Sequence, residues 1–358
     1  MLKYLRRDPI IILVLALPLA FLAEIGHWGE LWVFILSALG VVPMARYIGE
    51  ATQALARYTG PRVGGLLNAT LGNAAELIIT IFAIREGLLD LVKASITGSI
   101  LGNLLLVMGM AMVVGGIRNG AQSFHRQQAS NNAILLSLAI VALVVPSLFS
   151  HYIGPDSSVK VEALSIGVAG VMILLYAFGL FFSIKLNAGP LSAPLDESEH
   201  SVKHGWSVRT ALIVLALSTV GVAFLSELLV GAVEPVVASL GISEFFLGII
   251  LIPLIGNVAE HLVALQVAAQ NKMDLSVEIA VASSLQIALF VAPALVFVSL
   301  LIGNPLTLIF NQFELIALIA GVLIAAMVSA DGESNWLEGA ELLAVYVILG
   351  LAFYLLPV

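Results

Sequence analysis

The chain has 358 residues, of which 60% are hydrophobic and 11% are charged, and its mean hydropathy is +1.08. A water-soluble fold of this length cannot bury that much apolar surface, so the composition places the chain in a lipid bilayer. The formal net charge of -8 argues against nucleic-acid binding, which favours clustered Lys and Arg, and the absence of cysteine excludes disulfides and thiolate metal sites.

A hydrocarbon core of about 30 Å requires about 20 apolar residues per helix, and on this basis we predict an all-α polytopic membrane protein with eleven transmembrane helices. The first apolar run follows Lys3, Arg6 and Arg7 and resembles a signal peptide. No small-residue cleavage site follows it, so we interpret it as a retained helix. The predicted spans are residues 10–26, 31–49, 63–84, 93–116, 131–150, 159–184, 209–231, 244–269, 275–302, 306–329 and 337–357.

The distribution of basic residues predicts the orientation in the membrane. If the N-terminus lies inside, twelve of the 15 Lys and Arg residues fall in segments that are not translocated. The three on the opposite side are Arg85, Lys93 and Lys160. This bias predicts a cytoplasmic N-terminus and a C-terminus outside.

One polar stretch, residues 185–208, interrupts the apolar pattern and is interpreted as a cytoplasmic linker. It divides the chain into a leading transmembrane helix within residues 1–30, a first five-helix repeat at 31–184 and a second at 209–358. The linker residues Asp196, Glu197 and Glu199 are compatible with a cation sensor. Short acidic runs are usually just solvated, and we favour that interpretation.

An acidic motif occurs twice along the chain. The sequence GNAAE at residues 72–76 recurs as GNVAE at residues 256–260, and the 32 residues that begin at each glycine align without a gap at an offset of 184. Eight of the 32 positions are identical. Apolar helices resemble one another by chance, so the weight rests on the polar matches in register, such as Ser99 over Ser283. We interpret the pattern as an internal duplication.

The predicted orientation relates the two copies by an inversion. Glu76 lies in the third predicted span and Glu260 in the eighth, so five crossings separate them. An odd number of crossings means opposite directions. Inverted-topology repeats are typical of transporters that bind ions near the middle of the bilayer, between the repeats.

A carboxylate in mid-bilayer costs about 2.5–3.5 kcal/mol on insertion scales and normally faces the bundle interior or a water-filled cavity. A protonated glutamate with one interhelical hydrogen bond is the simpler explanation of a single case, but two cases in register favour a function. An asparagine precedes each glutamate by three residues, which predicts that Asn73 shares a helix face with Glu76, and Asn257 with Glu260.

Other residues near the motifs are expected to shape the site. Gly72 and Gly256 permit a neighbouring helix to approach closely, and Pro253 interrupts the helical hydrogen-bond ladder of the second copy. Polar residues on the following helices are candidates for an oxygen shell, although such residues more often only join helices. They are Ser99, Asn103, Ser283, Ser284 and Gln286.

Three further side chains are candidates for a proton relay. His261 follows Glu260 and points about 100 degrees around the helix from it, which favours a proton role or a hydrogen bond to another helix over metal ligation. Glu227 and Glu314 are candidate steps on a proton route, whereas the other acids near helix ends are expected to reach the interface.

Carboxylate and amide oxygens without sulfur favour a hard divalent cation. Ca2+ takes about six to eight oxygen ligands, Mg2+ loses its water reluctantly, and Zn2+ or Cu2+ requires more His or Cys. Two facing carboxylates without a cation cannot both stay ionised cheaply in a low dielectric, so protons and the cation compete for one site. This competition is the physical basis of an antiporter, which needs no cofactor.

The motifs carry a family resemblance. The sequences GNAAELI and KASITGSILGNLLL, and then GNVAEH and ASSLQIALFV, resemble the two repeat signatures of the Ca2+/H+ antiporter (CAX) family of the cation/Ca2+ exchanger superfamily, and the resemblance covers nearly the whole chain. It implies that Glu76 and Glu260 carry Ca2+ or protons within a shell of Asn73, Asn257, Ser99, Ser283 and Gln286. It also implies that the second and seventh spans are long gating helices.

The resemblance further implies a prokaryotic exchanger in the plasma membrane that exports Ca2+ against incoming protons; a homo-oligomer is left open. A Na+/Ca2+ exchanger of the same superfamily is the nearest alternative, but it is expected to carry a proline before the acidic residue, where Ala75 and Ala259 stand here. An intramembrane metalloenzyme using Glu260 and His261 lacks an HExxH pair. A purely structural membrane protein leaves the duplication of the acidic motif unexplained.

Overall fold

The computed structural model describes residues 9–155, 158–186 and 206–356, so the acidic part of the predicted linker lies outside the described residues. The first half contains η1 (Pro9–Leu15), α2 (Ala16–Ile25), α3 (Glu30–Leu71), α4 (Ala74–Arg85), α5 (Leu89–Leu101), the π-helical η2 (Gly102–Val107), α6 (Met108–Asn119), β1 (Gln122–Ser123), α7 (Arg126–Ile153) and α8 (Val159–Leu186).

The second half begins after the linker. It contains α9 (Val208–Gly231), α10 (Val233–Leu240), α11 (Glu244–Phe246), the π-helical η3 (Leu247–Leu251), α12 (Ile252–Gly256), α13 (Val258–Ala269), α14 (Met273–Gln286), the π-helical η4 (Ile287–Val291), α15 (Ala292–Ile302), α16 (Gln312–Val328), β2 (Glu333–Ser334) and α17 (Trp336–Tyr354). The two-residue strands β1 and β2 pair antiparallel and are a small departure from the predicted all-α fold.

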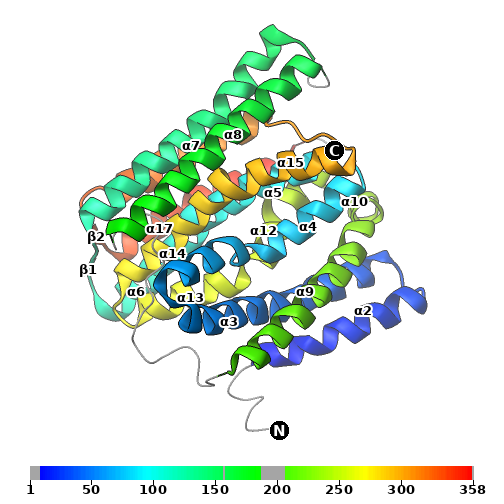
Figure 1. Ribbon diagram of the computed structural model, residues 1–358, viewed down its shortest axis with the longest axis horizontal. Helices are drawn as coiled ribbons and strands as arrows, with labels where there is room; N and C mark the ends of the chain where they lie inside the picture. Colours follow the sequence, from blue (N-terminus) through cyan, green and yellow to red (C-terminus); the bar gives the residue numbers. More distant parts are fainter. Residues whose placement is uncertain (1–8, 156–157, 187–205, 357–358) are drawn as a thin grey trace.

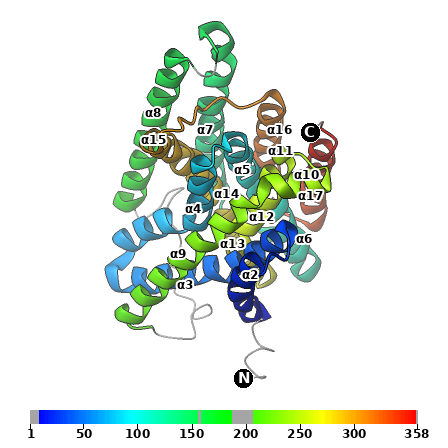
Figure 2. The same ribbon diagram turned by 90° about the vertical axis from the view of Figure 1, so that its right-hand side faces the viewer.

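The helices are arranged around a central group that carries both acidic motifs. Figure 1 shows α7 and α8 along one edge, α2, α3 and α9 along the opposite edge, and α4, α5, α12, α14 and α15 between them. The turned view in Figure 2 shows the same order. The pairing of α3 with α9 is the most extensive helix contact among the described residues. These two helices contain the second and seventh predicted spans.

The structure is that of an all-helical integral membrane protein. Among the described residues, seven helices are long and apolar enough to cross a membrane, or eight if the bent pair Val233–Leu240 and Glu244–Gly256 forms one span. Large apolar side chains such as Phe178, Phe181 and Leu217 are exposed on the surface, as lipid contact requires. Seven of the eleven predicted spans therefore correspond to long helices.

The other four predicted spans fall on shorter or interrupted helices. Residues 10–26 form η1 and α2, residues 306–329 include an extended segment before α16, and residues 63–84 and 244–269 are each interrupted. α3 also runs through the gap between the second and third predicted spans, although that gap contains Gly60 and Pro61, which disfavour a helix. Hydropathy counts apolar residues, so it shows neither a break inside an apolar segment nor a helix that continues through a less apolar one.

The prediction of a continuous helix through each acidic motif was wrong. α3 gives way to α4 at Gly72 and Asn73, and α12 gives way to α13 at Gly256 and Asn257. Each asparagine has non-helical backbone angles, with φ -95 and ψ 22 at Asn73 and φ -104 and ψ 6 at Asn257. Helical hydrogen bonding therefore restarts three residues before each glutamate, and the first turn of each short helix presents the carboxylate.

The duplication is visible in the element boundaries. α4 and α13 both have 12 residues, and their ends differ by the same offset of 184 that relates the motifs. Each is followed by a tight turn whose second residue has positive φ, Gly87 at 80° and Asn271 at 63°. π-helical segments follow α5 and α14 in turn. The two copies therefore share local backbone structure as well as sequence.

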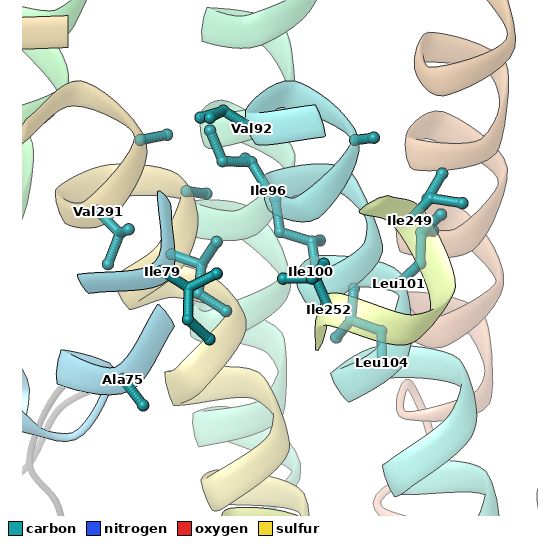
Figure 3. Packing of buried hydrophobic residues seen from close by; sticks show 14 of the residues in the cluster. Ala75, Ile79, Val92, Ile96, Ile100, Leu101, Leu104, Ile249, Ile252 and Val291 are labelled. Atoms are coloured by element: carbon teal, nitrogen blue, oxygen red, sulfur yellow. The ribbon is translucent and has the colours of Figure 1, made fainter. Parts of the chain in front are cut away.

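One apolar core surrounds the interrupted helices. Buried residues of α4, α5 and α12 belong to a single cluster, and Figure 3 shows part of it, including Ala75, Ile79, Ile100 and Ile252. α12 contacts both α4 and α5. Since this packing surrounds the first helical turn of α4 on several sides, Glu76 lies in an apolar environment from which water is largely excluded.

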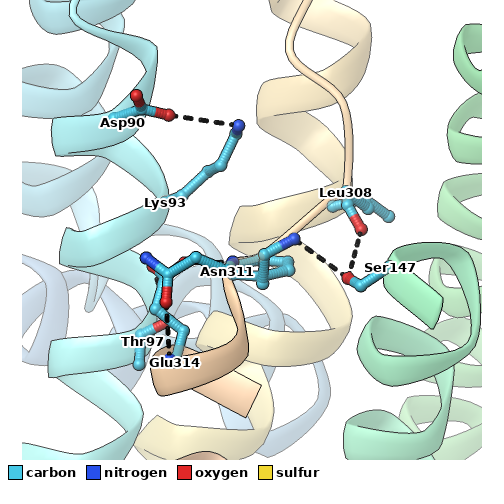
Figure 4. Close-up of polar contacts among 8 residues, drawn as sticks. Asp90, Lys93, Thr97, Ser147, Leu308, Asn311 and Glu314 are labelled. Atoms are coloured by element: carbon cyan, nitrogen blue, oxygen red, sulfur yellow. Dashed lines mark hydrogen bonds and ion pairs between the residues drawn. The ribbon is translucent and has the colours of Figure 1, made fainter. Parts of the chain in front are cut away.

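An extended segment between α15 and α16 is held by serine hydroxyls from three helices. Its backbone N–H groups are buried, and a polar group without a partner in such a place is costly. The backbone N–H groups of Leu306, Leu308 and Phe310 donate to serine hydroxyls. The acceptors are, in order, Ser299 of α15, Ser165 of α8 and Ser147 of α7, at 2.8, 3.0 and 2.9 Å. Figure 4 shows Ser147 beside this segment.

Candidate cation site

Glu76 is buried at the start of α4 and is held by two donors. The hydroxyl of Ser99 on α5 and the amide nitrogen of Asn257 both donate to its Oε1, the latter at 2.5 Å. Only 3% of Glu76 is exposed, and its second oxygen, Oε2, has no hydrogen-bond partner among the described residues. Asn257 belongs to the second copy of the motif, so this bond joins the two copies.

Glu260 occupies the equivalent place on α13. The hydroxyl of Ser283 on α14 donates to Glu260 Oε2 at 2.6 Å, and Asn103 Nδ2 donates to Ser283 Oγ at 3.0 Å. Glu260 is half-buried, whereas Glu76 is buried. The two copies bring both carboxylates to one site, because Asn257 of the second copy donates to Glu76 and Gly72 of the first copy lies against Glu260.

Asn73 points to the other copy rather than along its own helix. Its Nδ2 donates to Gln286 Oε1 at 2.8 Å, and its Oδ1 is buried without a hydrogen-bond partner among the described residues. The prediction that Asn73 shares a helix face with Glu76 was wrong, because Asn73 lies at the helix break. The same correction applies to Asn257, whose amide reaches Glu76 instead of Glu260.

The motif glycines let each copy pack against the carboxylate of the other. A Cβ atom added at Gly256 would lie 2.7 Å from Glu76 Cγ, and one added at Gly72 would lie 3.4 Å from Glu260 Oε1. The buried Pro253 stands four residues before Asn257 in α12, directly after the π-helical η3. Any side chain at Gly256 would therefore compete with Glu76 for space.

The structure does not bring every candidate to the carboxylates. Ser284 Oγ donates to the backbone carbonyls of Ala280 and Ile100, at 3.0 and 3.5 Å, so it joins helices. Glu227 is exposed and pairs with Arg85 at 3.3 Å. His261 is buried beside the site, and its Nε2 has no partner among the described residues.

Glu314 has a structural environment of its own. It forms a capping box with Asn311 at the start of α16, where each side chain accepts from the other's backbone N–H at 2.8 and 2.9 Å. Thr97 Oγ1 donates to Glu314 Oε1 at 3.3 Å, two residues before Ser99 on α5 (Figure 4). This buried carboxylate is thus tied to the same helix as the site.

Gly98 was missed by the sequence analysis. It lies beside Ser99 on α5, and a Cβ atom there would overlap the carbonyl of Ile249 in η3. This contact lets α5 approach the second copy closely next to Ser99, the residue that donates to Glu76. A signal was present, because Ala94, Gly98 and Gly102 form a series of small residues four apart, which is typical of close helix packing in membranes.

The available ligands suit an oxygen-binding cation. Among the described residues, no three His, Asp or Glu side chains lie close enough together to hold a metal ion by themselves. The site instead offers two carboxylates, the amide oxygens of Asn73 and Gln286, and hydroxyl oxygens of two serines. Ca2+ accepts such a mixed oxygen set.

Comparisons with known proteins identify the family. The model of the sodium/calcium exchanger protein family matches residues 29–185 and 210–355. The chain is 44% identical to the Ca2+/H+ antiporter of Aphanothece halophytica over 97% of this chain and 96% of that protein. It is 45% identical to the Ca2+/H+ antiporter ChaA of Bacillus subtilis (strain 168), and the alignment covers 97% of this chain and 98% of that protein. The chain belongs to the Ca2+/H+ antiporter family of the sodium/calcium exchanger superfamily.

The fold agrees with that family. The solved structure of native YfkE matches with a TM-score of 0.85 and 43% sequence identity, and covers 97% of this chain and 100% of that one. The family predicted from the two acidic motifs is therefore confirmed. As a member of this family the protein is a transporter and not an enzyme, so the metalloenzyme alternative is set aside.

Proposed function

We propose that this protein exchanges Ca2+ for protons across a membrane by alternating access, and that Glu76 and Glu260 bind either Ca2+ or protons. The observation that carries the proposal is that both Glu76 Oε2 and Asn73 Oδ1, which belong to the first acidic motif, are among the buried oxygens without hydrogen-bond partners in the described residues. A buried polar atom is normally satisfied, and each unsatisfied one costs about 1–3 kcal/mol. Ca2+ would satisfy both oxygens, and a proton would satisfy the carboxylate.

The coupling follows from the burial of the carboxylates. An empty site would hold two charges in a low dielectric, which is unfavourable, so the site reorients when it carries Ca2+ or when it carries protons. Protons on Glu76 and Glu260 remove the charge that binds Ca2+. Binding of one substrate therefore displaces the other. This competition couples the movement of Ca2+ in one direction to the movement of protons in the opposite direction.

The proposed architecture is one leading helix followed by two five-helix repeats of opposite orientation, giving eleven crossings. Two observations support this architecture. The ends of α4 and α13 differ by the same 184 residues, and the family model matches the chain in two stretches, 29–185 and 210–355, on either side of the linker. The distribution of basic residues supports a cytoplasmic location for the N-terminus and the linker. The bacterial relatives favour the plasma membrane, where the exchanger would export Ca2+ against incoming protons.

The two halves of the site differ in accessibility. On α4, every residue from Ala74 to Ile84 is buried or half-buried, whereas α13 exposes Leu262 and Val263 and leaves Glu260 half-buried. In the proposed orientation α13 leads from the site to the cytoplasm.

Transport by the purified protein in lipid vesicles tests the proposal. An imposed pH gradient is expected to drive 45Ca2+ uptake without Na+, and Glu76→Gln and Glu260→Gln are each expected to abolish it. Glu24→Gln, which removes an exposed carboxylate in α2, serves as the control and should keep transport. Uptake that requires Na+ would favour the Na+/Ca2+ exchanger alternative, and uptake that survives both site substitutions would show that the site is wrong.

A further inference from the structure

The far ends of the two carboxylate helices are capped by asparagine side chains. Asn304 Nδ2 donates to the carbonyl oxygens of Ile84 and Arg85, the last two residues of α4, at 2.9 and 3.3 Å. Asn119 Nδ2 donates to the carbonyl oxygens of the last two residues of α13, at 3.2 and 3.5 Å. The last carbonyls of a helix have no partner within it. The Ile84 and Ala268 carbonyls accept a backbone N–H from the following turn, and the asparagine amides add a second donor there and also reach the carbonyls of Arg85 and Ala269.

The two caps are related by the duplication and cross between its copies. The capped carbonyls differ by the offset of 184 residues that relates α4 to α13. Asn119 is the last residue of α6, in the first half of the chain, and caps a helix of the second half. Asn304 follows α15, in the second half, and caps a helix of the first. Each carboxylate helix is thus attached at its far end to the opposite copy.

This attachment restrains how the short helices lie. α4 is about 18 Å long, and Glu76 is its third residue, joined to Asn257 of the other copy. With Asn304 at the other end, α4 is fixed at two points and cannot pivot about the site. Asn304 is itself anchored, because the extended segment that follows it is held by the serine hydroxyls of α15, α8 and α7.

We propose that Asn119 and Asn304 are positioning residues that fix the far ends of α13 and α4 and thereby set the Ca2+ affinity of the site; this rests on the proposed function. Ca2+ requires several oxygens within a narrow range of distances, and a helix that pivots at one end moves its carboxylate relative to the others. Neither asparagine touches the carboxylates, so both act through the helices that they cap.

The two caps are not equally supported. Gln122 Nε2 also donates to the Ala268 carbonyl at 3.3 Å and to Asn271 Oδ1 at 2.8 Å, and His125 Nδ1 pairs with Asp274 at 2.6 Å nearby. No comparable second side-chain donor lies at the end of α4 among the described residues. The loss of Asn304 should therefore have the larger effect, and the loss of Asn119 should be severe only when Gln122 is lost as well.

Equilibrium 45Ca2+ binding to the purified full-length protein tests this proposal, with thermal unfolding measured in parallel. Asn304→Leu and Asn304→Asp, which both remove the donating amide, are expected to raise the Kd for Ca2+ about five- to tenfold. Asn304→Gln, which keeps an amide donor, should restore most of the affinity. Asn119→Leu should change the Kd less than Asn304→Leu does. The double variant Asn119→Leu with Gln122→Leu should raise the Kd as much as Asn304→Leu does.

A destabilised but unrelated variant separates positioning from general instability. Asn335→Leu removes the N-cap of α17, so it should lower the unfolding temperature and leave the Kd unchanged. A Kd within twofold of the wild type for both Asn304→Leu and Asn304→Asp would overturn the proposal, whatever happens to the unfolding temperature. A wild-type protein that binds no Ca2+ would instead overturn the proposed function, and this inference with it.

Discussion

Glu76 and Glu260 are each held by a serine that lies 23 residues further along the chain, Ser99 and Ser283 respectively. The sequence alone named both serines as candidates for an oxygen shell, because the glutamates and the serines match at one offset, but it did not assign either serine to a particular glutamate. The bonds that cross between the copies were not foreseen. Asn257 was assigned to Glu260 and instead donates to Glu76, since the spacing within one helix cannot show which helix of the other copy comes closest.

The contact between Gly256 and Glu76 leads to a prediction for a single methyl group. Gly256→Ala would place a Cβ atom 2.7 Å from Glu76 Cγ, and such overpacking costs about 1–3 kcal/mol. If the carboxylate moves to relieve it, Ca2+ affinity should fall about five- to 150-fold, as measured by 45Ca2+ binding. The control is Gly170→Ala in α8, where a Cβ atom meets nothing within 4 Å. Equal affinities in the two variants would contradict the proposed geometry.

The breaks within the helices could not be predicted from the sequence. Hydropathy located the seven long apolar helices among the described residues, but it did not show that α4 and α13 start at the motif asparagines or that π-helical segments follow α5 and α14. A break costs hydrogen bonds, and tertiary contacts such as Asn73 with Gln286 and Asn257 with Glu76 compensate for it. Those contacts join residues more than 180 positions apart, so local sequence carries little trace of them.

The packing of α5 on η3 gives a prediction at this scale. Gly98→Ala would place a Cβ atom inside the van der Waals radius of the Ile249 carbonyl, which is backbone and cannot rotate away. We expect a loss of about 1–3 kcal/mol in stability and a lower unfolding temperature in detergent. Gly102→Ala, one helical turn further on, is the matched control because a Cβ atom there meets nothing within 4 Å. A Gly98→Ala protein as stable as this control would mean that α5 and η3 are less closely packed.

The two copies together give the molecule its proposed symmetry. They correspond closely from the acidic motifs to the ends of α6 and α15, where both the element boundaries and the asparagine caps repeat. The correspondence is weaker at α8 and α17, which have 28 and 19 residues. The sequence revealed the duplication only around the motifs, because elsewhere apolar side chains exchange freely against lipid without changing the packing.

The proposed eleven crossings can be tested by the accessibility of single cysteines, for which the cysteine-free chain provides a background without labelling. Ser198→Cys in the linker should react with a membrane-impermeant maleimide only from the cytoplasmic side. Ser158→Cys, between α7 and α8, and Val358→Cys should react only from outside. A C-terminal cysteine that reacts from the cytoplasm would require an even number of crossings and a different arrangement of the repeats.

Competition between Ca2+ and protons for Glu76 and Glu260 is the central claim, and proton release on Ca2+ binding tests it most directly. Purified protein in weakly buffered solution is titrated with Ca2+ while the pH and the bound 45Ca2+ are recorded. The wild type is expected to release protons in proportion to the Ca2+ bound, and Glu76→Gln and Glu260→Gln should reduce both quantities. Ca2+ binding without proton release in the wild type, or unchanged release in both variants, would contradict the shared site.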